Sequence, residues 1–188
     1  LEDTGKSLVL RKLAEEKKDE LTLLGGSLRK LGYISEVKSL LSEFVQYRIE
    51  PEDLTQIMEQ NKSNPQLYFK LKDMKVIYES FRQYLKDTYL TAEELLKALE
   101  DTVEQSRSVR NSVIVLDGYH GFTPIQLGLI GRLLMLTDEL YVTMTLDHRE
   151  EPFQMEAEHQ LFYATKKTIQ DLRKVAEQTG VEIRKPIM

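Results

Sequence analysis

The chain has 188 residues, a formal net charge of −5 and 41% hydrophobic residues, a composition typical of an ordinary globular protein. It has no cysteine, no secretory signal and no apolar run near the roughly 20 residues of a membrane span, so disulfides, zinc–thiolate sites, iron–sulfur ligation and a membrane partner are excluded, and a cytoplasmic location is expected. Basic residues are not concentrated in any segment. Because neutralisation of phosphates supplies most of the affinity for nucleic acid, we expect any bound nucleic acid to be held mainly by surfaces outside this chain.

Residues 1–110 predict an all-helical subdomain, because apolar residues recur there every three to four positions. The predicted helices cover residues 6–21, 34–47, 51–58, 67–85 and 92–103. The last begins at a capping box from Thr91 to Glu94 and is expected to turn three apolar side chains inward: Leu95, Leu99 and Val103. Gly5-Lys6-Ser7 matches only the end of a phosphate-binding loop, so a helix start is favoured there.

Aromatic residues on and just after the longest predicted helix have two possible roles. They can form a platform on which single-stranded bases stack, or they can pack against neighbouring helices. Their spacing favours packing, because most of it follows the period of a buried helical face. The residues concerned are Tyr68, Phe69, Tyr84 and Tyr89.

Residues 111–188 change in character and predict an α/β unit. Strands are expected at 113–116, 140–146 and 181–187, with helices from Thr123 to about residue 138 and from 161 to a stop at Gly180. The order β-α-β-α-β implies a parallel three-stranded sheet with right-handed crossovers. Such a sheet leaves its edges unpaired, and the chain does not begin with Met, so we expect a piece of a longer protein.

Two acidic residues close predicted parallel strands, Asp117 after the first and Asp147 after the second. His120 and His148 lie close to them in sequence, and two acids with two imidazoles can bind a divalent metal and activate water. The alternative is that Asp117 and Asp147 form turns, as Asp commonly does at strand ends. A Mg²⁺-dependent phosphohydrolase that uses Asp117 and Asp147 therefore stays open as one hypothesis.

The stretch V-I-V-L-D-G-Y-H-G-F-T-P-I-Q at 113–126 resembles motif II of the superfamily 1 helicases, in which four apolar residues precede D-E-x-Q. It resembles more closely the AddB (RexB) family, subunits of the bacterial AddAB ATP-dependent helicase-nucleases, which share the D-G-F/Y and F-T-P turn. The segment L-S-E-F-x-x-Y-x-I-x-P-E-D-L within 33–54 and the segment beginning L-F-Y-A-T at 161 are similar to the family's helical insertion and downstream element.

The resemblance implies a fold and a set of site residues. It implies a helical insertion subdomain at 1–110, followed at 111–188 by part of a RecA-like domain, in an α-rich α/β fold. Asp117 matches the Mg²⁺-associated Asp of motif II, Gly118 replaces its catalytic Glu and His120 replaces its Gln. Since glycine cannot accept a proton, the site is expected to be hydrolytically incomplete. Tyr119 and Phe122 fall on the loop that faces the DNA path in the family, although burial of Phe122 is an equal alternative.

The resemblance also implies a role and partners. The family acts in double-strand break repair by homologous recombination, where an AddA-like motor subunit moves along single- and double-stranded DNA ends. ATP with Mg²⁺ and an iron–sulfur cluster belong to the whole subunit or complex, whereas no cofactor is expected in this chain. The implied role is DNA binding, recombination-hotspot recognition and complex assembly without catalysis by the chain itself. A helical protein-interaction module is the remaining alternative.

Overall fold

A computed structural model describes residues 2–27, 30–86, 89–155 and 157–187. The chain forms two compact units, Leu1–Leu95 and Leu96–Met188, and each is described by itself. The division lies within helix α5 (Ala92–Thr102). The division into a helical insertion subdomain at 1–110 and part of a RecA-like domain at 111–188 stays a prediction from the sequence.

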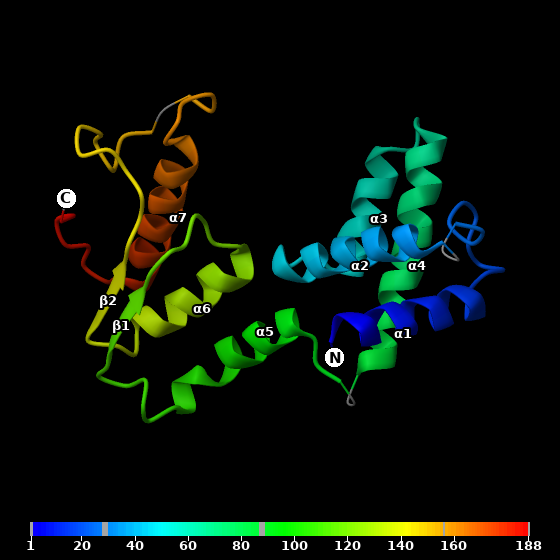
Figure 1. Cartoon of the computed structure of the whole chain (residues 1–188), viewed down its shortest axis with the longest axis horizontal. Helices are drawn as coiled ribbons and strands as arrows, with labels where there is room; N and C mark the ends of the chain where they lie inside the picture. The colour runs from blue at the N-terminus through cyan, green and yellow to red at the C-terminus, as the bar shows by residue number, and fades with distance from the viewer. Residues whose placement is uncertain (1, 28–29, 87–88, 156, 188) are drawn as a thin grey trace. The chain divides into compact units, whose positions relative to one another are not determined.

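The first unit is a bundle of helices around one apolar core, as the sequence predicts. Helix α1 packs against α2 and crosses α4, and α3 lies along α4 (Figure 1). The core takes side chains of at most 1% exposure from each of these helices, namely Leu10, Ile34, Leu54 and Ile77. The helices are α1 Asp3–Glu16, α2 Leu31–Gln46, α3 Pro51–Gln60, α4 Pro65–Leu85 and the first turn of α5.

The first helix ends five residues earlier than predicted, at Glu16 rather than at residue 21. The competing structure is a loop held by Asp73 of α4, which is fully buried. Its carboxylate accepts hydrogen bonds from three successive backbone N–H groups, those of residues 22, 23 and 24, at 2.8, 2.6 and 2.8 Å. These amides therefore bond to a buried side chain rather than to helical carbonyls, which holds the chain after α1 in a loop.

The prediction that α5 buries an apolar stripe is only partly right. Val103, in the short 3₁₀ turn Val103–Gln105, is buried, but Leu95 and Leu99 are 55% and 46% exposed. The capping box is confirmed, because the Thr91 N–H donates to Glu94 and the Glu94 N–H donates to Thr91 Oγ1. The period of apolar residues identified the helix, whereas the presence of a neighbour against that face is a tertiary property.

The aromatic residues of α4 differ in their surroundings. Tyr84 packs against the core, with the Lys12 ammonium 5.0 Å from its ring centre. Tyr68 and Phe69 contact each other edge to face near the start of the helix, and Tyr89, beyond its end, is 46% exposed. Packing is thus the observed role of Tyr84, and base stacking by the others stays the untested alternative.

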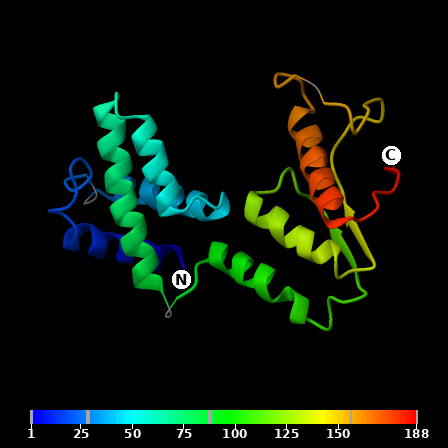
Figure 2. The same cartoon turned by 180° about the vertical axis from the view of Figure 1, so that it is seen from behind.

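The second unit has an α/β arrangement, which together with the first unit confirms the α-rich α/β class. Strands β1 (Val113–Leu116) and β2 (Glu139–Val142) are parallel, with Val113 opposite Glu139 and Leu116 opposite Val142. Helix α6 (Pro124–Leu134) connects them, and α7 (Tyr163–Thr179) packs on α6 (Figure 2). At Gly131 of α6 an added Cβ would lie 3.3 Å from a side chain of α7, so glycine permits the close packing.

The predicted third strand at 181–187 is wrong, because these described residues adopt no strand. Gly180 ends α7 in the left-handed conformation, as predicted, and the Val181 N–H donates back to the carbonyl of Ala176. Beyond it Ile183 and Ile187 are 42% and 92% exposed. Alternation of apolar residues fits a strand but cannot supply the neighbouring backbone that a strand requires. In the parts of the chain that the structure describes, no helix has the length and apolarity of a membrane span.

Candidate functional site: the loop after the first strand

The loop from Asp117 to Thr123 lies at the carboxyl end of β1. Asp117 is exposed, and its carboxylate accepts a hydrogen bond from the hydroxyl of Thr143, the residue that follows β2. The Thr143 N–H also donates to the carbonyl of Leu116 at 3.0 Å, so the two strands remain paired up to the acid. The first predicted site residue is therefore fixed to the sheet edge by a residue that sequence reasoning missed. The parallel register identifies Thr143 as this partner: Leu116 lies opposite Val142, and Asp117 and Thr143 are the residues that follow them.

Gly118, which the resemblance to motif II aligns with a catalytic Glu, has a positive φ of 78°. A side chain at this φ is strained by about 1–2 kcal/mol, because Cβ approaches the following carbonyl oxygen. An added Cβ at Gly118 would otherwise meet no atom within 4 Å. The backbone conformation itself, and not a lack of space, therefore favours glycine at this point of the loop.

Tyr119 and Phe122 form a stacked aromatic pair on the same loop. Their ring centres are 5.0 Å apart and their planes are inclined by 27°. Tyr119 is 42% exposed, while Phe122 is half-buried beneath it. The Tyr119 ring is therefore exposed to solvent and stacked on the Phe122 ring. This arrangement suits stacking of Tyr119 against a further flat, apolar surface.

Helix α7 and the start of α6 hold the loop from the other side. Thr168 of α7 donates a hydrogen bond from Oγ1 to the carbonyl of Ala164 in its own helix at 2.9 Å, and the same hydroxyl oxygen lies 3.4 Å from the backbone carbonyl oxygen of His120, whose side chain is exposed. An added Cβ at Gly121 would lie 3.6 Å from the same hydroxyl. At the end of the loop the Thr123 N–H donates to the Gln126 side chain at 2.8 Å, which ties the loop to the first turn of α6. The loop is therefore anchored by hydrogen bonds at both ends, and its middle lies against α7.

Asp147, the other acid of the metal hypothesis, is engaged elsewhere. Both of its carboxylate oxygens accept from the Arg149 guanidinium, at 3.0 and 2.8 Å, and the Arg149 N–H adds a third bond at 2.9 Å. These bonds hold the pKa of Asp147 below its usual value. Among the described residues, no group of three or more His, Cys, Asp or Glu side chains is placed to hold a metal ion.

A second feature that the sequence analysis did not predict is the ion pair between Lys166 of α7 and Glu150 in the loop after β2. Lys166 is 1% exposed, and its ammonium lies 2.7 Å from the carboxylate of Glu150 in the loop after β2. The same loop is held further along α7, where Gln170 donates to the carbonyl of Phe153 at 3.1 Å. The loop after β2 therefore covers part of α7 beside the helical turn that supports the loop after β1.

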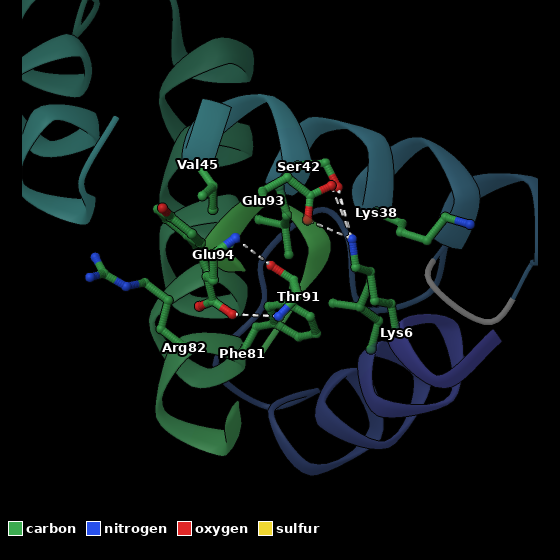
Figure 3. Close-up of a pocket in the computed structure, with 12 residues that line it drawn as sticks. Lys6, Lys38, Ser42, Val45, Phe81, Arg82, Thr91, Glu93 and Glu94 are labelled. Atoms are coloured by element: carbon green, nitrogen blue, oxygen red, sulfur yellow. Dashed lines mark hydrogen bonds and ion pairs between the residues drawn. The ribbon is translucent and has the colours of Figure 1, made fainter. Parts of the chain in front are cut away.

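The helical unit contains a pocket in which Lys6 is paired with Glu93 and Thr91 with Glu94 (Figure 3). Lys6 reaches from α1 to Glu93 at 2.8 Å and to the Ser42 hydroxyl at 3.4 Å. Burial alone would raise the pKa of Glu93, but hydrogen bonds, chiefly from Lys6, its own backbone N–H and Ser42, outweigh it and lower that pKa to about 2. Lys6 lies within helix α1, as the helix-start interpretation requires, and serves to join α1 to the first turn of α5.

Comparisons with known proteins agree with the sequence motif in this loop. A family model described as "ADDB, N-terminal" matches residues 1–188. A protein from Lachnoclostridium phytofermentans, named as the B-type subunit of an ATP-dependent helicase/deoxyribonuclease, is 39% identical over 188 residues, which are 100% of this chain and 16% of that protein. Proteins of the same name from Oceanobacillus iheyensis and Caldanaerobacter subterraneus are each 32% identical, over 100% and 97% of this chain and 17% and 15% of their own lengths. The chain thus spans about a sixth of the length of these relatives. Since the family match covers every residue, the chain belongs to the AddB N-terminal family.

Proposed function

We propose that this chain is the N-terminal-family region of an AddB-type subunit and that it contributes DNA contact and complex assembly to double-strand break repair by homologous recombination. It works in the cytoplasm beside an AddA-like motor subunit, on single- and double-stranded DNA ends. The observation that carries the DNA contact is the stacked pair of Tyr119 and Phe122, anchored on a loop at the strand edge where ligands of α/β folds gather.

The chemistry of the loop supports contact rather than catalysis. Asp117 is followed by Gly118, whose positive φ disfavours the carboxylate that would orient an attacking water. Asp117 itself is bound by Thr143. ATP hydrolysis is therefore assigned to the motor subunit, and the ATP, Mg²⁺ and iron–sulfur cluster of the complex to regions outside this chain. We assign recognition of a recombination hotspot to the same loop, because the exposed Tyr119 ring can stack on an unpaired base.

The test uses the two-subunit complex with Tyr119→Ala or Phe122→Ala in the AddB-type subunit. Base-on-aromatic stacking contributes about 1–3 kcal/mol, so we expect single-stranded DNA affinity to fall by roughly 5- to 150-fold and the hotspot response to weaken with it. Fluorescence anisotropy with a labelled oligonucleotide measures the affinity. Tyr47→Ala is the matched control, because Tyr47 is 56% exposed and lies on the helical unit.

Two results would count against the proposal. If both loop variants bind single-stranded DNA and respond to the hotspot as the native complex does, the loop makes no DNA contact and the protein-interaction alternative gains. If Asp117→Asn abolishes a metal-dependent turnover of this subunit, the site is catalytic. The hydrolase is not carried forward as a second function, because the carboxylates of Asp117 and Asp147 are bound to Thr143 and Arg149.

A further inference from the structure

The first turns of helix α7 lie between two loops (Figures 1 and 2). On one side the Lys166 ammonium lies 2.7 Å from the carboxylate of Glu150 in the loop after β2. Gln170, one helical turn further on, shares that side and donates to a carbonyl of the same loop at 3.1 Å. Thr168 lies about half a turn from both and therefore faces the opposite side. Its hydroxyl oxygen lies 3.4 Å from the carbonyl oxygen of His120, so α7 joins the loop after β2 to the loop after β1.

The buried ammonium fixes α7 against the loop after β2. A lysine on a helix normally keeps its ammonium in water, as the adjacent and exposed Lys167 does, whereas Lys166 is 1% exposed. Burial of an ammonium has a large free-energy cost unless an anion compensates it. The Glu150 carboxylate, on a side chain that is 30% exposed, supplies this compensation. Displacement of the loop from α7 would separate the two charges, so the ion pair favours one position of the helix.

The centre of the loop after β1 depends on α7 for its position. Hydrogen bonds anchor the two ends of this loop. Between those ends Gly118 and Gly121 lie on either side of Tyr119, and glycine permits more backbone conformations than other residues. At Gly121 an added Cβ would lie 3.6 Å from the Thr168 hydroxyl, so the backbone lies directly against the helix there. A shift of α7 near Thr168 would therefore displace the part of the loop that carries the aromatic rings.

We propose that Lys166 is a positioning residue for the stacked pair of Tyr119 and Phe122. Its ammonium is buried, so it acts on bound DNA only through the ion pair with Glu150, which holds α7 and with it the centre of the loop. The inference rests on the proposed function, in which the stacked pair contacts an unpaired base. Rings that are held in place lose less conformational freedom on binding, so the ion pair increases the affinity for single-stranded DNA without contributing a contact.

The first measurement reads the position of the loop in the two-subunit complex without DNA. Chymotrypsin cuts after aromatic residues, and cleavage after Tyr119 is quantified from the masses of the product peptides. Lys166→Met removes the charge and keeps an unbranched side chain. We expect this change to speed cleavage after Tyr119 by at least roughly fivefold, because proteolysis follows local opening. Glu150→Gln alters the charge partner without a change in α7 and should act in the same direction. Lys167→Met is the matched control and should leave the rate unchanged.

Cleavage after Tyr141, in strand β2, separates positioning from a general loss of structure. A variant that only destabilised the α/β unit would open the strand as well as the loop, and cleavage would then rise equally after Tyr141 and Tyr119. A rise confined to Tyr119 supports the proposal. An equal rise at both sites, or an unchanged rate after Tyr119 in Lys166→Met and Glu150→Gln, overturns it.

The second measurement is the affinity of the same complexes for a labelled single-stranded oligonucleotide. Lys166→Met should weaken binding by about tenfold through the loss of pre-organisation. It should have no further effect in a background with Tyr119→Ala and Phe122→Ala, because it acts through those rings. Additive effects, or native affinity in Lys166→Met where Tyr119→Ala weakens binding, overturn the proposal. Native affinity in Tyr119→Ala and Phe122→Ala refutes the proposed DNA contact instead, and the cleavage rates still decide whether Lys166 places the loop.

Discussion

Replacement of Asp73 by Asn should release the loop that follows α1. Asp73 is fully buried and accepts three backbone hydrogen bonds, of which the bond from the Leu24 N–H is buried and those from Thr22 and Leu23 are partly exposed. A hydrogen bond to a charged group contributes about 1.5–3 kcal/mol, and amides that reach water recover part of the loss. Asn keeps one acceptor oxygen but turns an NH₂ group toward another N–H. We therefore expect a loss of about 3 kcal/mol in the free energy of unfolding.

Two measurements check this expectation on different scales. Urea unfolding followed by circular dichroism gives the change in the free energy of unfolding. Native-state hydrogen exchange shows whether the amides of residues 22–24 lose protection before the amides of α4 do. Asp19→Asn is the matched control, because Asp19 is an exposed acid in the loop that Asp73 holds. A loss below about 0.5 kcal/mol with unchanged exchange at residues 22–24 would refute the assigned role of Asp73.

Other substitutions test the ion pair of Lys6 with Glu93 and the glycine at position 118. Glu93→Gln leaves Lys6 buried without its charge partner and should cost about 3 kcal/mol, whereas the double change Lys6→Met with Glu93→Leu should recover most of the loss in a double-mutant cycle. The pKa of Glu93 is lowered in the folded state from 4.5 to about 2, so its stabilisation is present above pH 4.5 and is lost as the pH falls toward 2. The stability difference between the native chain and Glu93→Gln should shrink in that window, and a pH-independent difference would contradict the assignment. Gly118→Ala should cost about 1 kcal/mol because of its positive φ, while Gly26→Ala, with no atom within 4 Å of its added Cβ, should change the urea midpoint little.

The helices of the first unit follow from local sequence, and their ends follow from contacts. Apolar spacing and the capping boxes that begin at Glu50 and Thr91 determine where α3 and α5 begin. The loop after α1 is held by Asp73, which lies 51 residues from Thr22 along the chain. A single acidic residue in a helical pattern predicts a solvent-exposed side chain. The burial of Asp73 and its three amide partners become apparent only in the structure, where α4 lies against the loop after α1.

The candidate site divides in the same way. The strand, the acid at its end, the glycine after it and the helix cap at Thr123 are all readable from residues 113–126, because each depends on neighbours in sequence. The partners of that loop come from elsewhere: Thr143 follows the second strand and Thr168 lies on α7. Parallel pairing and helix packing bring them to the loop, and neither residue carries a local signal of its own.

The sequence by itself determined the helical half, the α/β half and family membership, since periodicity, caps and the D-G-Y turn act over a few residues. Only the tertiary structure decided that residues 181–187 form no strand, that Leu95 and Leu99 face outward, and that one face of the sheet carries exposed valines. An apolar pattern specifies which side chains favour burial. Whether they are buried depends on backbone and side chains that other parts of the chain place against them.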